Sequence, residues 1–150
     1  MPVPIWAGHY IGLPFQGHGR DRSGLDCWGL VRLVMAEQFN IALPSHTHEY
    51  QRTTQAEKIS ALIEREAQKW KIIPAGRELC GDVIVLRVRG KPMHVGMVLG
   101  DQQMLHIEQG IDSVIERYSG PHWAERVAGF YRYKSFYGDS PEGFFEDDSN

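Results

Sequence analysis

Apolar residues recur along the chain with two different periods, and the change from one to the other divides the sequence. Before residue 80, two segments repeat apolar positions every three or four residues, whereas after Gly81 the apolar residues form short runs. The first spacing is typical of helices that bury one face, and the second is typical of strands. Helices followed by strands predict an α+β domain, with N-terminal helices packed on a mostly antiparallel central sheet.

The first helix is predicted over residues 27–39, after a segment, residues 1–25, whose prolines and glycines indicate irregular structure. Asp26 suits the helix start, since its carboxylate can accept from free backbone N–H groups and complements the helix dipole. The apolar positions share one broad face: Leu30, Val31, Val34, Met35 and Phe39.

The second helix is predicted to begin near Thr54 and Glu57, which have the spacing of a capping box. Its apolar stripe continues to the end of the predicted helix: Ile59, Leu62, Ile63, Ala67 and Trp70. The Ile-Ile-Pro sequence at residues 72–74 should end it. Residues 40–53, between the two helices, are expected to form a surface loop.

Five apolar segments predict the sheet. Residues 82–88 form a continuous run, which indicates a central strand covered on both faces. Residues 94–99 and 103–107 flank a Gly-Asp turn and predict a hairpin. Residues 114–115 and 128–133 supply further strands.

Composition indicates one ordinary globular domain. The chain has 150 residues, 42% hydrophobic and 23% charged, and a net charge of -3. This charge argues against a nucleic-acid partner, which would require clustered Lys and Arg. We expect residues 1–137 to form the domain and residues 138–150 to form an acidic tail.

The sequence does not suggest membrane insertion or export. No run approaches the ~18 apolar residues that span a bilayer, so no membrane partner is expected. The first residues lack the basic and apolar regions of a secretory signal, so we expect synthesis and folding in a cytoplasm.

Cys27 is the first candidate for chemistry, because it stands in the first turn of the predicted helix. Free N–H groups and the helix dipole stabilise a thiolate there and should lower the cysteine pKa. A thiolate is the nucleophile of cysteine enzymes. The alternative is a small buried cysteine with a packing role.

His94 and His106 lie in the two strands of the predicted hairpin. They oppose each other directly if the loop has an odd length and is centred on Gly100. One imidazole could then take the thiol proton while the other fixes its tautomer. The alternative for each is a hydrogen-bonded residue of the sheet.

The two cysteines do not require a disulfide between Cys27 and Cys80, and we expect Cys80 to be structural. A zinc site of Cys27, Cys80, His94 and His106 is chemically conceivable, but the paired spacing that marks such sites is absent. We expect no metal and no cofactor.

Together these residues resemble the NlpC-type family of papain-like cysteine peptidases. Residues 26–31, Asp-Cys-Trp-Gly-Leu-Val, resemble its nucleophile motif, and residues 81–83, Gly-Asp-Val, resemble the start of its first central strand. Residues 94–98, His-Val-Gly-Met-Val, resemble the strand of its catalytic histidine. His106 falls where the family places its third polar residue. The resemblance implies a papain-like NlpC-type fold.

By this resemblance Cys27 is the nucleophile, His94 the general base and His106 the orienting residue. The Cys27 backbone N–H, near Asp26, would contribute to an oxyanion hole. Phe15 stands where the family usually has a tyrosine near that site.

Two further residues belong to the expected oxyanion or substrate region. His18 lies in the loop before Cys27 and could donate the hydrogen bond that the absent tyrosine hydroxyl would otherwise give. Trp28 replaces the small residue that usually follows the cysteine, and its ring could narrow the cleft or stack on substrate.

The resemblance implies a thiol protease that degrades cell walls by hydrolysing peptides of bacterial peptidoglycan, commonly at the γ-D-glutamyl–diaminopimelate bond. The Asp-Cys-Trp-Gly-Leu-Val-Arg sequence resembles leaderless members from phage tail tips and gene-transfer particles, which implies a place in a virion tail beside other tail proteins. Two alternatives remain: an inactive tail-assembly module on the same fold, or another papain-like amidase or acyltransferase.

Overall fold

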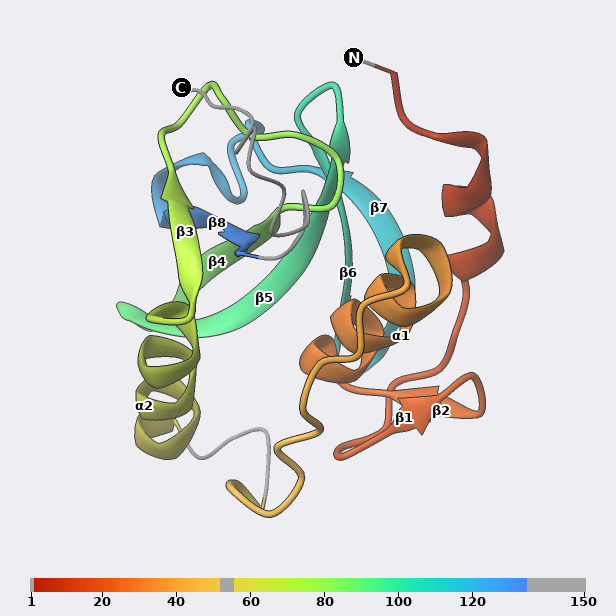
Figure 1. Cartoon of the computed structure of the whole chain (residues 1–150), viewed down its shortest axis with the longest axis vertical. Coiled ribbons are helices and arrows are strands. Elements are labelled where there is room, and N and C mark those ends of the chain that lie inside the picture. The colour runs from red at the N-terminus through yellow and green to blue at the C-terminus, as the bar shows by residue number, and fades with distance from the viewer. Residues whose placement is uncertain (1, 52–55, 135–150) are drawn as a thin grey trace.

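The computed structural model describes residues 2–51 and 56–134, in which an antiparallel sheet is packed against helices (Figure 1). The elements are η1 (Ile5–Tyr10), β1 (Arg20–Asp21), β2 (Gly24–Leu25), α1 (Cys27–Phe39), α2 (Ala56–Ala67), β3 (Trp70–Ile73), β4 (Val83–Val88), β5 (Lys91–Gly100), β6 (Gln103–Glu108), β7 (Ile111–Arg117), η2 (Ala124–Arg126) and β8 (Val127–Tyr133). The expected acidic tail, residues 138–150, lies outside the described residues.

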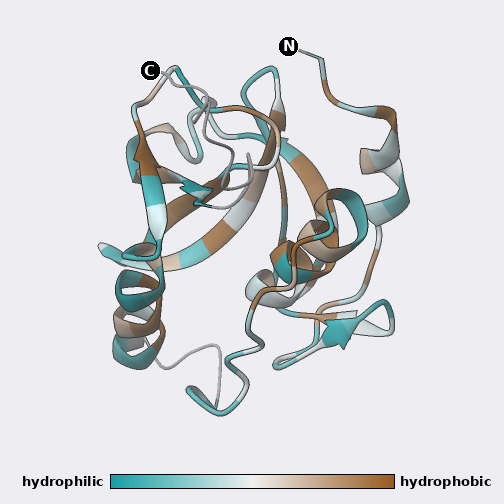
Figure 2. Ribbon diagram, viewed as in Figure 1, coloured by the Kyte–Doolittle hydropathy of each residue, from teal (hydrophilic) through white to brown (hydrophobic). Residues whose placement is uncertain are grey.

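The main sheet has six strands in the order β3-β8-β4-β5-β6-β7, and all its pairs are antiparallel. The expected α+β architecture is therefore confirmed. Strand β4 is central, and four of its six residues are buried, in agreement with its continuous apolar run. Figure 2 shows hydrophobic residues along these inner strands and hydrophilic residues on the outer turns of α2.

The predicted register of the β5–β6 hairpin is wrong. Met97 pairs with Leu105, and the loop is a two-residue turn in which Asp101 and Gln102 both have positive φ, 53° and 57°. Continuing this register places His106 opposite Gly96 rather than His94. A Cβ on Gly96 would lie 3.2 Å from the Cβ of His106, so glycine leaves room for the diagonal contact between the two histidines.

Helix α1 has the predicted bounds, Cys27–Phe39, and the predicted buried face. The Asp26 carboxylate accepts from the backbone N–H of Gly29 at 2.8 Å, which confirms the expected cap. A Cβ on Gly29 would lie 2.0 Å from the carbonyl oxygen of Gly19. The helix start and the preceding loop therefore approach each other at a distance that only glycine permits.

Helix α2 is shorter than predicted. It ends at Ala67, and Trp70 begins strand β3 instead of ending the helix. The prediction failed because Trp70 continues the helical spacing of apolar residues, yet its neighbours Lys71-Ile72-Ile73 pair with β8. The predicted capping residue Thr54 lies outside the described residues.

The N-terminal segment is less irregular than expected, since it contains the 3-10 helix η1 and the short pair β1–β2. The main core lies between α1 and the sheet, chiefly β5 and β6. Helix α2 contacts β3 and β5 near one end of the sheet. Among the described helices, none has the length and apolar character that crossing a membrane requires.

Candidate active site

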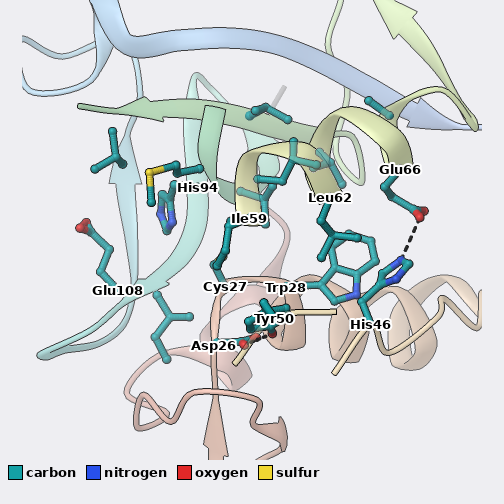
Figure 3. Close-up of a pocket in the computed structure, with 18 of the residues that line it drawn as sticks. Asp26, Cys27, Trp28, His46, Tyr50, Ile59, Leu62, Glu66, His94 and Glu108 are labelled. Atoms are coloured by element: carbon teal, nitrogen blue, oxygen red, sulfur yellow. Dashed lines mark hydrogen bonds and ion pairs between the residues drawn. The ribbon is translucent and has the colours of Figure 1, made fainter. Parts of the chain in front are cut away.

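A pocket of about 270 Å³ lies between the start of α1, the central strands and helix α2. Cys27 and His94 both line it, and Figure 3 shows them beside each other at one wall. The structure thus brings the predicted nucleophile and base, which are 67 positions apart in sequence, to one cavity. Apolar side chains form much of the lining: Ile59, Leu62, Ile63, Trp70, Val83, Val85, Met93, Val95 and Ile107.

The expected low pKa of Cys27 is not found. Burial, followed by the neighbouring Asp26 carboxylate, raises the pKa of the Cys27 thiol to about 12. Backbone hydrogen bonds from Val95 on β5 and from Trp28 in the first turn of α1 lower it, but they do not outweigh the burial. In the free protein Cys27 is therefore a neutral thiol.

His94 is also neutral. Burial, together with the nearby His106 and Arg126, lowers the pKa of His94 to about 3. A neutral imidazole can accept a proton, so His94 remains chemically suited to be a base even though no thiolate–imidazolium pair has formed.

A chain of hydrogen bonds leads from His94 to the edge of the sheet. His94 Nε2 lies 2.9 Å from His106 Nδ1, and His106 Nε2 lies 2.8 Å from Glu116 Oε1. The predicted orienting residue therefore contacts the predicted base. Sequence reasoning missed Glu116, because the predicted strand stopped at residue 115, before the carboxylate that shares the face of His106.

Trp123 packs against both histidines and was also missed. Its ring stacks on His94 with centroids 5.7 Å apart and meets His106 edge-on at 5.6 Å. The indole is fully buried, and the Arg126 guanidinium lies 4.2 Å from its centroid on the ring face. Trp123 therefore excludes water from one side of the histidine pair and holds the plane of the His94 ring.

The Asp26 carboxylate lines the pocket and accepts several hydrogen bonds from the surrounding backbone and side chains. Besides Gly29, it accepts from Arg20 Nη1 at 2.8 Å, from the His18 backbone N–H at 3.0 Å and from the Tyr50 hydroxyl. The Asp26 side chain is 1% exposed. Its contacts join the start of helix α1 to two loops.

His18 does not take the role considered for it. Its Nε2 lies 2.5 Å from the carbonyl oxygen of Tyr50, its ring packs against the Tyr50 ring, and it is not among the pocket residues. Tyr50 was not predicted, because it lies in an expected surface loop. Its hydroxyl donates to Asp26, so that proton is already committed.

Phe15 and Trp28 both line the pocket. Phe15 contributes an apolar ring where the family pattern has a hydroxyl. The Trp28 indole N–H donates to the Pro44 carbonyl at 2.8 Å, which fixes the ring in the pocket wall. Trp28 therefore shapes the cavity from the position next to Cys27.

The pocket wall also carries a polar cluster that was not predicted from the sequence. His46 contacts Glu49 through Nδ1 at 2.5 Å and Glu66 through Nε2 at 2.9 Å (Figure 3). Glu66 also accepts from the Trp70 indole at 3.0 Å. These bonds tie helix α2 to the loop that follows α1 and so fix the width of the pocket.

The zinc set considered from sequence does not form among the described residues. A different group of possible ligands, in which Glu108 joins His94 and His106, has its ligand atoms within 4.8 Å of one another. The two histidine nitrogens in that group already share a hydrogen bond, so a metal would have to break it. Cys27 and Cys80 are free thiols.

Comparisons with known proteins identify the family of the chain. The sequence model of the NlpC/P60 family matches residues 12–132. The murein DD-endopeptidase MepS/murein LD-carboxypeptidase of Escherichia coli K12 is 26% identical over 115 residues, which are 77% of this chain and 53% of that protein. The chain thus spans about half the length of the curated relatives it matches.

Solved structures share the fold. An NlpC/P60 family protein from Bacillus cereus ATCC 10987 is similar over 88% of this chain and 41% of that one, with a TM-score of 0.64 and 21% identity. The NlpC/p60 domain of peptidoglycan hydrolase SagA is similar over 75% of this chain and 84% of that one, with a TM-score of 0.53 and 24% identity. These matches confirm the expected NlpC-type fold.

Proposed function

The chain belongs to the NlpC/P60 family, and from this premise we propose that it is a cysteine peptidase that hydrolyses peptide bonds of bacterial peptidoglycan. One observation carries the proposal: Cys27 and His94 line the same pocket, and His94 is held by His106 from behind. The names of two similar proteins, a murein endopeptidase and a peptidoglycan hydrolase, support the class of substrate.

The reaction begins with two neutral groups. As substrate enters, His94 takes the proton of the Cys27 thiol while the sulfur attacks the carbonyl carbon of the scissile bond. The C–N bond then breaks, and the leaving amine takes the proton from His94. Water hydrolyses the thioester, with His94 again as base, and this step releases the carboxylate and restores the thiol.

The negative charge on the carbonyl oxygen needs a donor. We assign the backbone N–H of Cys27, because the first N–H groups of a helix have no acceptor within the helix. Phe15 supplies no hydroxyl and the Tyr50 proton is held by Asp26, so this site has fewer donors than the family pattern. For this reason we expect turnover to be slower than in members that have the hydroxyl. From the family resemblance we propose the γ-D-glutamyl–diaminopimelate bond as the bond that is cleaved.

We further propose that residues 1–137 act as one peptidase domain delivered by a phage tail tip or gene-transfer particle. The Asp-Cys-Trp-Gly-Leu-Val-Arg sequence at residues 26–32 supports this setting through its resemblance to that group. The acidic residues 138–150 would then dock on another tail protein by charge.

Three observations favour second candidates. The apolar wall made by Ile59, Leu62 and Met93 suits a substrate with an apolar acyl group, as in another papain-like amidase or acyltransferase. The missing hydroxyl at Phe15 and the raised pKa of Cys27 favour an inactive tail-assembly module.

Digestion of purified peptidoglycan, followed by mass spectrometry of the soluble fragments, tests the proposal. Wild type and Cys80→Ala should release the same peptides, whereas Cys27→Ala should release none. The new termini identify the bond. No fragments from wild type, together with hydrolysis of an apolar acyl ester, would favour the acyltransferase; no reaction with either substrate would favour the inactive module.

A further inference from the structure

Glu116 lies on β7 at the end of the hydrogen-bonded chain behind His94, and it has no place in the mechanism above. Its Oε1 lies 2.8 Å from His106 Nε2, and its side chain is 39% exposed, whereas the His106 side chain is 2% exposed. The carboxylate is therefore a charged group at the surface that reaches a buried imidazole.

The state of this carboxylate fixes the proton of His106. Burial would raise the pKa of Glu116, but the neighbouring Trp123 indole and the His106 hydrogen bond outweigh it, so its pKa is lowered. The indole Nε1 itself makes no hydrogen bond of standard geometry within the described part of the chain. An ionised carboxylate can accept but not donate, so His106 Nε2 must carry a hydrogen.

The remaining protons follow along the chain. An imidazole that carries its one hydrogen on Nε2 has a bare lone pair on Nδ1. His94 Nε2, at 2.9 Å, must then donate to it. Because His94 is neutral, its other nitrogen, Nδ1, carries no hydrogen and is free to act as a base.

We propose that Glu116 is a positioning residue that sets the tautomers of both histidines, so that His94 presents an unprotonated Nδ1 to the Cys27 thiol. The inference rests on the proposed role of His94 as the general base. Without Glu116, His106 can carry its hydrogen on Nδ1 and donate to His94 Nε2. His94 then holds its hydrogen on Nδ1 and cannot take the thiol proton.

Glu108 provides a matched control. Its carboxylate also approaches His106, but it lies 4.0 Å from Nδ1, the nitrogen on the other side of the ring. A general effect of negative charge near His106 would come from either glutamate. A tautomer effect requires the carboxylate on Nε2 and therefore belongs to Glu116 alone of the two.

Nitrogen-15 NMR of histidine-labelled protein reads the tautomers without substrate. Wild type should show hydrogen on Nε2 of both His94 and His106, and Glu108→Gln should leave this pattern unchanged. Glu116→Ala should populate the Nδ1–H tautomer of His94. Glu116→Gln, whose amide oxygen can still accept from His106, should largely restore the wild-type pattern.

Turnover of a soluble peptidoglycan peptide adds the kinetic test. Glu116→Ala should lower kcat by about 10- to 100-fold with little change in KM, in the range found for partners of metal-bound histidines, and Glu116→Gln should recover most of the loss. An Nδ1–H tautomer of His94 in wild type, or unchanged tautomers and kcat in Glu116→Ala, would overturn the inference. Wild-type protein with the expected tautomers but no turnover would refute the proposed function and leave the tautomer assignment intact.

Discussion

The thiol of Cys27 should be unusually unreactive in the free protein, which is the opposite of what its place at a helix start suggests. Its pKa is raised from 9.0 to about 12. Alkylation by iodoacetamide proceeds through the thiolate, so the pH profile of the rate measures this pKa directly.

The expected effect is large. At pH 7 a thiol of pKa 9.0 is about 1% thiolate, and a thiol of pKa 12 is about 0.001% thiolate. Cys27 should therefore react about 1,000-fold more slowly than an ordinary cysteine at this pH, and its rate should keep rising tenfold per pH unit through pH 9.

Cys80 supplies an internal comparison. Burial raises its pKa to about 11, so it should react about tenfold faster than Cys27 on the thiolate fraction alone. Peptide mapping by mass spectrometry separates the two sites, and unfolded protein gives the reference rate. A plateau in the Cys27 rate below pH 8.5 would show a preformed thiolate–imidazolium pair and refute the neutral-pair account.

Three further predictions concern stability, measured by urea denaturation. Asp26→Ala should lower the free energy of unfolding by about 3–5 kcal/mol, because it leaves the buried partners of a charged group unsatisfied, whereas the exposed Asp21→Ala should change it by less than about 1 kcal/mol. Gly29→Ala should cost about 3 kcal/mol or more by steric clash, whereas Gly8→Ala, with nothing within 4 Å of a new Cβ, should be close to neutral; equal effects would refute the packing argument. His94 has a pKa of about 3 in the folded protein and 6.5 in the unfolded chain, so between these pH values only the unfolded chain binds a proton there. The free energy of unfolding should therefore fall by up to about 1.4 kcal/mol per pH unit as the pH decreases from 6.5 to 3. His94→Phe should remove this part of the pH dependence.

The sequence predicted the elements that have strong local signals. Helix α1 has the predicted bounds because Asp26 caps it and its apolar residues follow one period. Trp70 was misplaced because its spacing fits a helix, whereas its pairing with Tyr133 on β8 is a long-range contact that no local pattern reveals.

The same difference between local signals and long-range contacts explains which residues of the candidate site were predicted. Cys27, His94 and His106 were predicted as site residues from motifs, and the structure brings His94 and His106 together by a register other than the predicted one. Glu116 and Trp123 were missed, since their roles depend on which side chains share a face or a buried contact after folding. The pKa of Cys27 was predicted with the wrong sign because burial by the sheet outweighs the local helix-start effect.

The central claim is that Cys27 carries the acyl group of the substrate. Rapid acid quenching during the first turnover of a peptidoglycan peptide, followed by intact mass measurement and peptide mapping, tests it most directly. We expect an adduct with the mass of the acyl fragment on the peptide that contains Cys27, and no adduct or turnover with Cys27→Ala. Turnover by Cys27→Ala at the wild-type rate, with no adduct on Cys27 in the wild type, would contradict it.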